Sequence, residues 1–560
     1  MRTLGTRAHA LERLAQTAPA DPLDLLVVGG GITGAGIALD ASSRGLRTGL
    51  VERFDFASGT SSKSSKLVHG GLRYLEQREF GLVREASTER DLLRRLAPHL
   101  VEPIPFVLPV ADRWRRAKFG VGLWAYNALA TFKNLHIHRH VDAETTERLV
   151  PSLPRGKVKG GYLFYDCKTD DVRLVMEVLV QAHAYGAVVL NYAAVHDIEP
   201  AGAAGICNVL VEDAATAQTF EVRARRVVAA AGVWGDRVEG LARNESSPRL
   251  RPSKGVHVLF DRASLSMTDA AVFIPDAERR RMLFVIPWLD AVLVGTTDTA
   301  YEGSLDHPRV EEEDRAYCVN AVNRAFGTLL TERDIVGAYA GLRPLIAGKG
   351  GPTADLSRKH AVYDIAPGVI GITGGKLTTF RRMAGDAVDR LASDLGAHGK
   401  SRTRWIRLGS SDVGALRAAV DRRARRLAMG EGPASNLVRC YGERALAVLD
   451  VAEETGLLGS LVEGRDPLAA EAVYCARAEM ARNLNDVLVR RTRLALTDAA
   501  GGLGPGSEAA SIMGAELGWD GAEQARQVYA HRAAVEEERA APVPTDTSPA
   551  AAGAVREGIG

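Results

Sequence analysis

The sequence has few cysteines, almost no net charge and no long hydrophobic run. Its 5 cysteines lie far apart in 560 residues, without a Cys-x-x-Cys pair, which argues against a disulfide scaffold or zinc ribbon and suits a reducing compartment. Lys and Arg total 71 against 69 Asp and Glu, a net charge of +2, so a nucleic-acid binder acting by phosphate neutralisation alone is excluded. Without 18 consecutive apolar residues we expect no membrane-spanning helix, and the polar N-terminus lacks the apolar core of a signal peptide.

The composition that remains is that of a globular protein of several domains. Hydrophobic residues make up 46% and charged residues 25%, which excludes global disorder, and the length predicts three or four domains at roughly 150 residues each. Residues 1–20 form a short amphipathic lead, and the Pro/Ala/Gly-rich tail 540–560 is predicted to be disordered. After about residue 400, glycine turns give way to predicted helices over 412–428, 434–457, 467–498 and 507–538.

A glycine motif near the N-terminus predicts a dinucleotide site. Residues 23–28 read as a buried strand, 32–44 as a helix and 47–52 as a second strand, which together make a βαβ unit. The intervening turn contains Gly29-x-Gly31-x-x-Gly34. The first glycine permits the tight turn, the second lets the backbone approach a pyrophosphate, and the third lets helix and strand pack closely. The free amides at the helix N-terminus favour phosphate.

An acidic residue and two later segments favour FAD over a nicotinamide cofactor. Glu52 ends the second strand, where its carboxylate can accept both hydroxyls of the adenosine ribose. VVAAAGVW (227–234) is a further predicted strand, ending at Gly232. GVIGITGGKL (368–377) is a strand leading into a helix after Gly374 and Gly375. A helix N-terminus there would stabilise negative charge on a reduced flavin ring.

Several blocks of the sequence resemble the FAD-dependent glycerol-3-phosphate dehydrogenases of the aerobic, membrane-associated type. The strongest is TSSKSSKLVHGGLRYLE (60–76). The others are KGVHVLF (254–260), VIPWLDAVLVGTTD (285–298), YAGLRPL (339–345), GGKLTTFRRMA (374–384) and EMARNLNDVLVRRTRLAL (479–496). The likeness covers about residues 22–500, in the family's order.

The resemblance implies an α/β fold with three units. The first is an FAD-binding doubly wound domain, like those of glutathione reductase and the amino-acid oxidases. It is discontinuous, built from residues 21–104, 155–245 and 335–400. A sheet-based substrate or cap domain comprises 105–154 and 246–334, and an all-helical C-terminal domain comprises 401–539.

The resemblance also implies an activity. Hydride would pass from C2 of sn-glycerol 3-phosphate to FAD, giving dihydroxyacetone phosphate, and the electrons would go to a membrane quinone. The alternatives are a glycerol-3-phosphate oxidase that reduces oxygen to peroxide and an amine or amino-acid oxidase of the same fold. A further alternative, from another class, is a flavin-stabilised scaffold whose Arg-rich helical domain binds a partner.

This chemistry needs a cationic clamp for phosphate, a proton acceptor and a polarising charge near the nascent carbonyl. His69 is the candidate base, with His257 second, although either ring could be a packed structural histidine. Arginine forks suit phosphate. By resemblance, Arg73, Arg343, Arg358 and Lys376 line the substrate site. We therefore expect the catalytic set His69, Arg73, Arg343 and Lys376, and the substrate-binding set Arg73, Tyr74, His257, Arg343, Arg358 and Lys376.

The expected FAD contacts combine the glycine motif, the late glycine-led helix and, by resemblance, the Ser-rich block. They are Gly29, Gly31, Ile32, Gly34, Glu52, Thr60, Ser61, Ser64, Lys66, Leu67, Val195, Gly232, Gly374, Gly375, Leu377 and Thr378. The alternative for the Ser-rich block is a flexible surface loop. No metal-ligand spacing appears, since the histidine tract 136–140 has no carboxylate or cysteine partners nearby.

Residues 112–140 mix aromatic and basic side chains. Phe119, Leu123, Tyr126 and Ala130 share one helical face, which suits a helix lying in the interface of an anionic membrane. The alternative is a helix packed on the protein. With the resemblance, we expect a cytoplasmic protein bound peripherally to the inner face of the cell membrane. The helical domain is an alternative site for a homodimer contact, and the sequence leaves the oligomeric state open.

Overall fold

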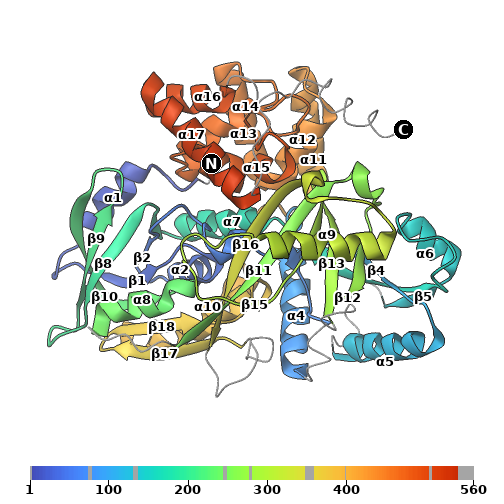
Figure 1. The fold of residues 1–560 in the computed structure, drawn as a ribbon. Coiled ribbons are helices and arrows are strands. Elements are labelled where there is room, and N and C mark those ends of the chain that lie inside the picture. Colours follow the sequence, from blue (N-terminus) through green and yellow to red (C-terminus); the bar gives the residue numbers. More distant parts are fainter. Residues whose placement is uncertain are drawn as a thin grey trace.

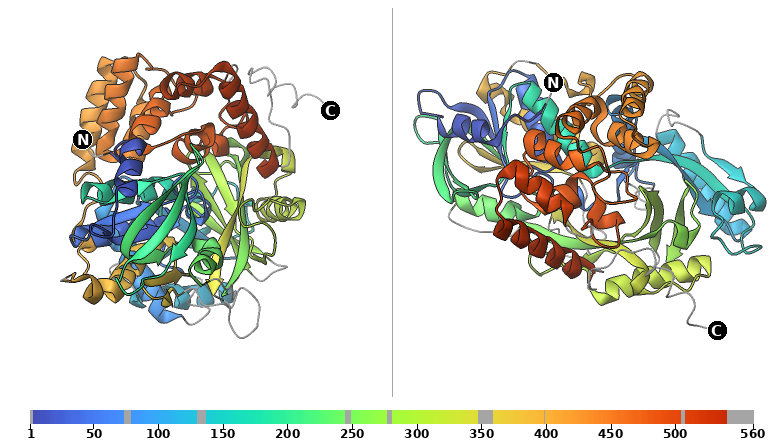
Figure 2. Two further views of the ribbon diagram at one scale, coloured as in Figure 1. Left: turned by 90° about the vertical axis from the view of Figure 1, so that its left-hand side faces the viewer. Right: turned by 90° about the horizontal axis from the view of Figure 1, so that it is seen from above.

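The computed structural model describes residues 3–72, 79–129, 137–243, 249–276, 281–346, 359–397, 399–503 and 507–539. Two sheets lie side by side, and a group of helices covers both from one side (Figures 1 and 2). The elements therefore fall into the three units that the sequence predicts, in an α/β arrangement.

The first sheet has the strand order β17-β18-β10-β1-β2-β7, with β9 paired to β10 and β8 paired to β9. The strands from β18 to β7 run parallel, so helices must cover them and their residues are nearly all apolar. The bounds are β1 (Leu23–Val28), β2 (Thr48–Val51), β7 (Val188–Leu190), β8 (Ala193–Glu199), β9 (Cys207–Asp213), β10 (Gln218–Ala229), β17 (Ala361–Ala366) and β18 (Val369–Thr373).

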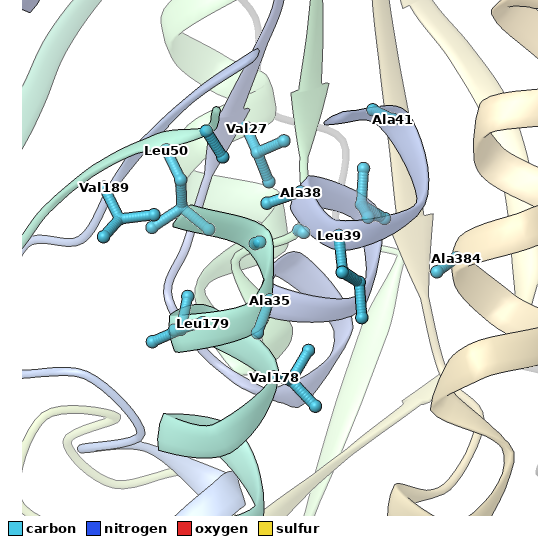
Figure 3. Packing of buried hydrophobic residues seen from close by; sticks show 14 of the residues in the cluster. Val27, Ala35, Ala38, Leu39, Ala41, Leu50, Val178, Leu179, Val189 and Ala384 are labelled. Atoms are coloured by element: carbon cyan, nitrogen blue, oxygen red, sulfur yellow. The ribbon is translucent and has the colours of Figure 1, made fainter. Parts of the chain in front are cut away.

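The central helix of this domain is α2 (Ile32–Ser43), which packs against α7 (Asp171–Ala184) and α10 (Phe380–Leu395). Figure 3 shows the contact: Ala35 and Ala38 of α2 lie near Val178 of α7 and the first-sheet strands, and Ala384 of α10 lies on the other side. Small side chains let the three helices approach closely. Two further helices, α1 (Arg7–Ala15) and α8 (Gly235–Arg243), also contact this sheet.

The second sheet has the order β15-β11-β14-β13-β12-β4-β6-β3, with β16 paired to β11 and β5 to β6. The bounds are β3 (Leu67–Val68), β4 (Glu102–Pro109), β5 (Arg139–Val141), β6 (Gly161–Lys168), β11 (Leu250–Asp261), β12 (Ala271–Asp276), β13 (Arg281–Trp288), β14 (Ala291–Gly295), β15 (Thr299–Ala300) and β16 (Ile335–Ile346). The predicted hairpin turn at Leu289–Asp290 is confirmed, because Trp288 of β13 pairs with Ala291 of β14. The helices around this sheet are α4 (Phe80–Leu96), α5 (Arg113–Leu129), α6 (Ala143–Leu149) and α9 (Glu312–Phe326).

Two strands lie in a different sheet from the one that the expected boundaries imply. The ranges 155–245 and 335–400 place β6 and β16 in the FAD-binding domain. In the structure β6 pairs with β4 from Glu102↔Lys168 to Pro109↔Gly161, and β16 pairs with β11 from Leu250↔Ile346 to Phe260↔Ile335. Each strand pairs with a second-sheet strand over its whole length, so both belong to the second sheet.

The C-terminal domain is helical, as predicted, but two of the expected helices are broken. The helix expected at 434–457 is two helices, α12 (Glu431–Tyr441) and α13 (Ala445–Thr455), because Gly442 between them has φ +53°. The helix expected at 467–498 ends at Glu479, because Met480 adopts φ +58°. The bounds are α11 (Val413–Arg426), α12 (Glu431–Tyr441), α13 (Ala445–Thr455), α14 (Ala469–Glu479), a π-helical turn (Asp486–Arg491), α15 (Leu494–Thr497), α16 (Glu508–Leu517) and α17 (Gly521–Arg539).

Buried ion pairs fasten the helical domain to the first domain. Arg173 of α7 donates two hydrogen bonds of 2.9 Å to Glu479 of α14, and Arg444 pairs with Glu177 of α7 at 2.9 Å. Because breaking a buried pair leaves an uncompensated charge, these contacts fix how the two domains sit together.

Candidate active site

A cavity of about 560 Å³ lies where the carboxyl ends of β1, β2 and β10 meet the second sheet. This is where open α/β sheets bind their ligands. Its wall includes the turn between β1 and α2, the Ser-rich loop before β3, and the glycine turn after β18. Residues far apart in the sequence thus converge on one site.

The glycine turn has the geometry that its sequence predicts. Gly29 has φ +116°, and a Cβ there would lie 2.6 Å from the carbonyl oxygen of Ala230. A Cβ on Gly34 would lie 1.9 Å from the carbonyl oxygen of Gly29. Gly31 is the N-cap of α2 and borders the cavity. Ser61 Oγ accepts the amide of Ile32 at 2.9 Å, so the Ser-rich loop already contacts the phosphate-binding end of this helix.

The Glu52 carboxylate is held at the end of β2 by two backbone amides. It accepts hydrogen bonds from Gly30 at 2.6 Å and from Phe54 at 2.9 Å. Burial raises the pKa of Glu52, and the two amide bonds oppose that rise. Val195 and Gly232, which also belong to the first domain, line the same cavity as Glu52. An acidic residue at the end of the second strand of a βαβ unit is where dinucleotide-binding folds bind the ribose hydroxyls.

The other end of the cavity is formed by Gly374 and Gly375, which have φ +76° and +78°. The glycines lead through Lys376 and a short 3-10 turn (Leu377–Thr379) into α10. Thr378 Oγ1 accepts the backbone amide of His69 at 3.2 Å. The late glycine-led segment therefore meets the HGGL block at the wall of the cavity.

Fourteen of the expected FAD contacts line the cavity, and two do not. The fourteen are Gly29, Gly31, Ile32, Glu52, Thr60, Ser61, Ser64, Leu67, Val195, Gly232, Gly374, Gly375, Leu377 and Thr378. Gly34 faces the strand β1 instead, as its packing role requires. The Lys66 side chain is fully buried and does not line the cavity, with Nζ 2.9 Å from Asp171. Burial lowers the pKa of Lys66 to about 8, against the opposing pull of Asp171.

Four of the expected substrate and catalytic residues line this cavity: His69, His257, Arg343 and Lys376. The other three, Arg73, Tyr74 and Arg358, lie outside the described residues. Arg343 Nη2 donates to Thr296 Oγ1 at 2.9 Å and to the carbonyl of Thr297 at 3.2 Å. The guanidinium is thus held at the cavity wall by neutral acceptors, and Asp298 lies 3.5 Å from its Nη1.

His257 is a buried, neutral ring. Its Nε2 shares a hydrogen bond of 2.8 Å with Ser65 Oγ, and the ring stacks on Tyr339 at a centroid distance of 5.1 Å. Burial, with Arg343 and Lys66 nearby, holds the pKa of His257 well below its usual value. Among the described residues, Nδ1 of His257 has no hydrogen-bond partner.

Sequence reasoning missed the residues that support the site rather than face it. Ser65, Tyr339 and Asp171 were not among the expected residues, although the first two fall within the quoted blocks. Ser65 could have been suspected from its place between two expected contacts. Asp171 could not, because only the fold brings the start of α7 beneath the Ser-rich loop.

Helix α5 corrects the expected membrane face. Leu123 and Tyr126 are 1% exposed, because this side of α5 packs on α4 and β6, and the Tyr126 hydroxyl accepts a hydrogen bond from Arg90 at 3.1 Å. Phe119 is partly buried, and Ala130 lies outside the described residues. The exposed apolar residues are on another side of the helix: Trp114 (76%), Val121 (72%) and Trp124 (62%).

Across the described ranges, no helix is long and apolar enough to cross a bilayer. The same part of the chain contains no group of three or more His, Cys, Asp or Glu side chains that could hold a metal ion.

Comparisons with known proteins agree with this architecture. A family model described as FAD dependent oxidoreductase matches residues 24–381, and one described as the C-terminal domain of alpha-glycerophosphate oxidase matches residues 401–524. The chain therefore belongs to the FAD dependent oxidoreductases, and its cofactor is FAD. The cavity wall includes the glycine turn after β1, the Glu52 carboxylate and the late glycine-led segment.

Named relatives define the family further. The chain is 40% identical over 547 residues to glycerol-3-phosphate dehydrogenase 2 of Mycobacterium tuberculosis (strain ATCC 25618 / H37Rv), covering 95% of this chain and 90% of the relative. It is 36% identical over 498 residues to the aerobic glycerol-3-phosphate dehydrogenase of Staphylococcus aureus (strain NCTC 8325 / PS 47), covering 86% and 88%. The structure of the glycerol-3-phosphate dehydrogenase from Bacillus halodurans complexed with FAD superposes with a TM-score of 0.77 at 30% identity, covering 96% of this chain and 99% of that one. The chain is a member of the FAD-dependent glycerol-3-phosphate dehydrogenase family.

Proposed function

We propose that this protein oxidises sn-glycerol 3-phosphate at C2 to dihydroxyacetone phosphate and passes the electrons to a membrane quinone. The observation that carries the proposal is the convergence of Arg343, Lys376, His69 and His257 on the cavity that holds the glycine turn. Two cations suit a phosphorylated substrate better than an amine or a neutral amino acid.

FAD bound in the cavity supplies the hydride acceptor. Arg343 offers a planar fork for the substrate's phosphate or nascent carbonyl oxygen, and it is pre-oriented by Thr296 and Thr297. Lys376 adds a second positive charge at the start of the turn before α10. When hydride leaves C2, the proton of the C2 hydroxyl must pass to a base so that the carbon–oxygen double bond can form.

Two histidines compete for the role of base. The sequence favours His69, which borders the cavity beside Thr378. His257 is the second candidate: it lines the cavity beside Arg343, and its lowered pKa leaves the ring without a proton before the reaction, although the same shift makes it a weaker base. His69→Gln and His257→Gln separate them: the base variant loses the acid limb of the pH profile of kcat, whereas the other keeps it.

The proposed acceptor is tested by steady-state assays with purified holoenzyme and sn-glycerol 3-phosphate. We expect formation of dihydroxyacetone phosphate to depend on an added soluble quinone and to release little peroxide in air. Stoichiometric peroxide in air would instead assign the protein to the oxidases. Turnover of glycine or an amine, but not of the phosphate ester, would overturn the substrate.

We further propose that α5 rests on the inner face of the cell membrane. Trp114, Val121 and Trp124 are exposed, and Arg113 and Arg115 are among the exposed basic residues beside them. Aromatic and basic side chains together favour an anionic interface. Figure 1 supports the geometry, because α5 lies at the lower edge of the molecule, on the opposite side from the helical domain.

Vesicle sedimentation tests this placement. We expect the protein to bind phosphatidylglycerol vesicles more strongly than phosphatidylcholine vesicles, and the double variant Trp114→Ser/Trp124→Ser to lose most of that binding. The control is Tyr529→Ser, which removes an aromatic side chain that is 78% exposed on α17 of the helical domain. Equal binding by all three proteins would contradict the assignment of α5.

A further inference from the structure

A cluster of four buried charges lies directly behind the Ser-rich loop of the site. It consists of Lys66 from that loop, Asp170 and Asp171 at the start of α7, and Arg493 from the helical domain. Their side chains are at most 5% exposed. Arg493 donates to Asp170 through Nε at 3.0 Å and through Nη2 at 2.8 Å, and Nη2 also contacts Asp171.

Asp171 links this cluster to the loop that lines the cavity. Its Oδ2 accepts the hydroxyl of Ser64 at 2.7 Å and the backbone amide of Ser64 at 3.2 Å. Both of its oxygens lie 2.9 Å from Lys66 Nζ. One carboxylate therefore holds both chain neighbours of Ser65. Tyr339 adds a hydrogen bond of 2.6 Å from its hydroxyl to the carbonyl of Ser64.

The backbone of this cluster is strained, which is consistent with a constrained loop. Lys66 has φ +57° and Arg493 has φ +66°, a region that residues with a Cβ rarely occupy. Such conformations persist only where surrounding contacts over-determine them, and they gather at functional sites. The two left-handed residues are the two cations that share Asp171.

Ser65 carries the restraint to the site. Its hydroxyl makes the 2.8 Å hydrogen bond to His257 Nε2. Because Nδ1 has no partner among the described residues and the ring is 2% exposed, the hydrogen bond from Ser65 to Nε2 orients this ring, together with the stacking on Tyr339. His257 borders the cavity together with Arg343.

We propose that Asp171 and Arg493 are positioning residues for the reaction: they fix the segment Ser64–Lys66, which in turn fixes Ser65 against His257. The helical C-terminal domain thereby sets the geometry of a site that it does not line. The proposal rests on the proposed function for the role of His257. It also gives a role to Arg493, which lies in the block at 479–496 and does not itself take part in the reaction.

The competing explanation is that Arg493 only joins two domains. A buried ion pair is weak evidence for stability, since replacing it by apolar groups is often neutral, so a purely structural role and a positioning role must be separated by experiment.

The chain offers a matched control in Arg444. This side chain is also buried, also belongs to the helical domain and also pairs with a carboxylate of α7, Glu177, at 2.9 Å. Its hydrogen bonds in the described part of the chain go to Glu177 and Glu479, and not to Ser64, Ser65 or Lys66.

The test compares Arg493→Lys, Arg444→Lys and Ser65→Ala as FAD-loaded proteins. In Arg493→Lys we expect faster hydrogen–deuterium exchange in peptides covering residues 60–69, and kcat for sn-glycerol 3-phosphate about 10-fold lower with bound FAD retained. Ser65→Ala should lower kcat similarly and move the acid limb of the pH profile in the same direction as Arg493→Lys. Besides Ser65, the groups facing His257 are Tyr339, Arg343 and Lys66, and all three remain. Arg444→Lys should change the melting temperature while leaving exchange at 60–69 and kcat within two-fold of the parent.

A double variant sharpens the result. If Arg493 acts through Ser65, Arg493→Lys/Ser65→Ala is no slower than the slower single variant, because the two changes break one chain of contacts. Multiplied losses would overturn the proposal, as would equal kcat losses in Arg493→Lys and Arg444→Lys.

Should Arg493→Lys fail to fold, Ser64→Ala removes the hydroxyl that Asp171 holds without touching the buried pair. Normal kcat and normal exchange in both Ser64→Ala and Ser65→Ala would then overturn the proposal. The exchange measurement does not depend on the substrate. If the parent protein is not reduced by the phosphate ester, the proposed function fails, while exchange at 60–69 still decides whether Arg493 positions the loop.

Discussion

Replacing Gly34 by alanine gives the most quantitative test of the cofactor site. The added Cβ would lie 1.9 Å from the carbonyl oxygen of Gly29 and 3.3 Å from a methyl group of Val27. The nearer obstacle is backbone, so α2 must move away from β1 by more than an ångström. Overpacking a core costs about 1–3 kcal/mol and occasionally more, and a clash with backbone belongs at the upper end.

The cost should appear as lost FAD affinity, because the displaced element is the N-terminus of the helix that faces the phosphates. About 3 kcal/mol corresponds to a Kd roughly 100-fold higher. Calorimetric titration of the apoprotein with FAD measures this, and thermal denaturation of the holoenzyme measures the accompanying loss of stability.

The matched control is Gly81→Ala. Gly81 lies in the first turn of α4, where an added Cβ meets no atom within 4 Å. Alanine is favoured over glycine in a helix by about 0.5–1 kcal/mol, so this variant should keep its FAD affinity and its melting temperature or gain slightly. If Gly34→Ala bound FAD within three-fold of the parent and melted at the same temperature, the close approach of α2 to the glycine turn would not be what the cofactor site requires.

Two further predictions concern the substrate and pH. Arg343→Lys loses the planar fork that Thr296 and Thr297 orient, so kcat/KM for sn-glycerol 3-phosphate should fall about 100-fold with FAD content unchanged; an unchanged kcat/KM would remove Arg343 from the substrate site. Burial would raise the pKa of Glu479, but Arg173, Arg444 and Arg491 lower it to about 2. Because the pKa is lower in the folded protein, Glu479 adds about 3 kcal/mol to the free energy of unfolding at pH values above 4.5, its pKa in the unfolded chain. This contribution is lost as the pH falls from 4.5 toward 2. The melting temperature of the parent should therefore fall over this pH range, and that of Glu479→Gln should fall less. If the melting temperatures of both proteins fell equally with pH, the lowered pKa of Glu479 would be contradicted.

The features predicted correctly are those encoded by neighbouring residues. The strand at 23–28, the helix after Gly31 and the glycine turn between them depend on local patterns of apolar residues and on the absence of a Cβ, and the structure reproduces them as β1 and α2. The hairpin turn at Leu289–Asp290 is local in the same sense. These patterns, with the order of the quoted blocks, were sufficient to locate the candidate site.

The features that were missed depend on contacts across the chain. The sequence around Lys66 is compatible with a side chain that faces the cofactor. In the fold, its ammonium group is buried against Asp171, which is distant in the sequence. Helical periodicity correctly groups Leu123 with Tyr126, but it does not say whether that face meets lipid or protein. Arg90 and Asp166, which contact the Tyr126 hydroxyl, decide the matter in favour of protein.

The central claim is that this FAD site oxidises a phosphorylated polyol, and an anaerobic reduction experiment tests it most directly. The purified yellow holoenzyme is mixed with sn-glycerol 3-phosphate, with glycerol or with glycine, and the visible absorbance of the flavin is followed. We expect rapid bleaching by the phosphate ester alone, because Arg343 and Lys376 border the same cavity as the glycine turn. A flavin that stays oxidised with the phosphate ester but is bleached by glycine would contradict the account.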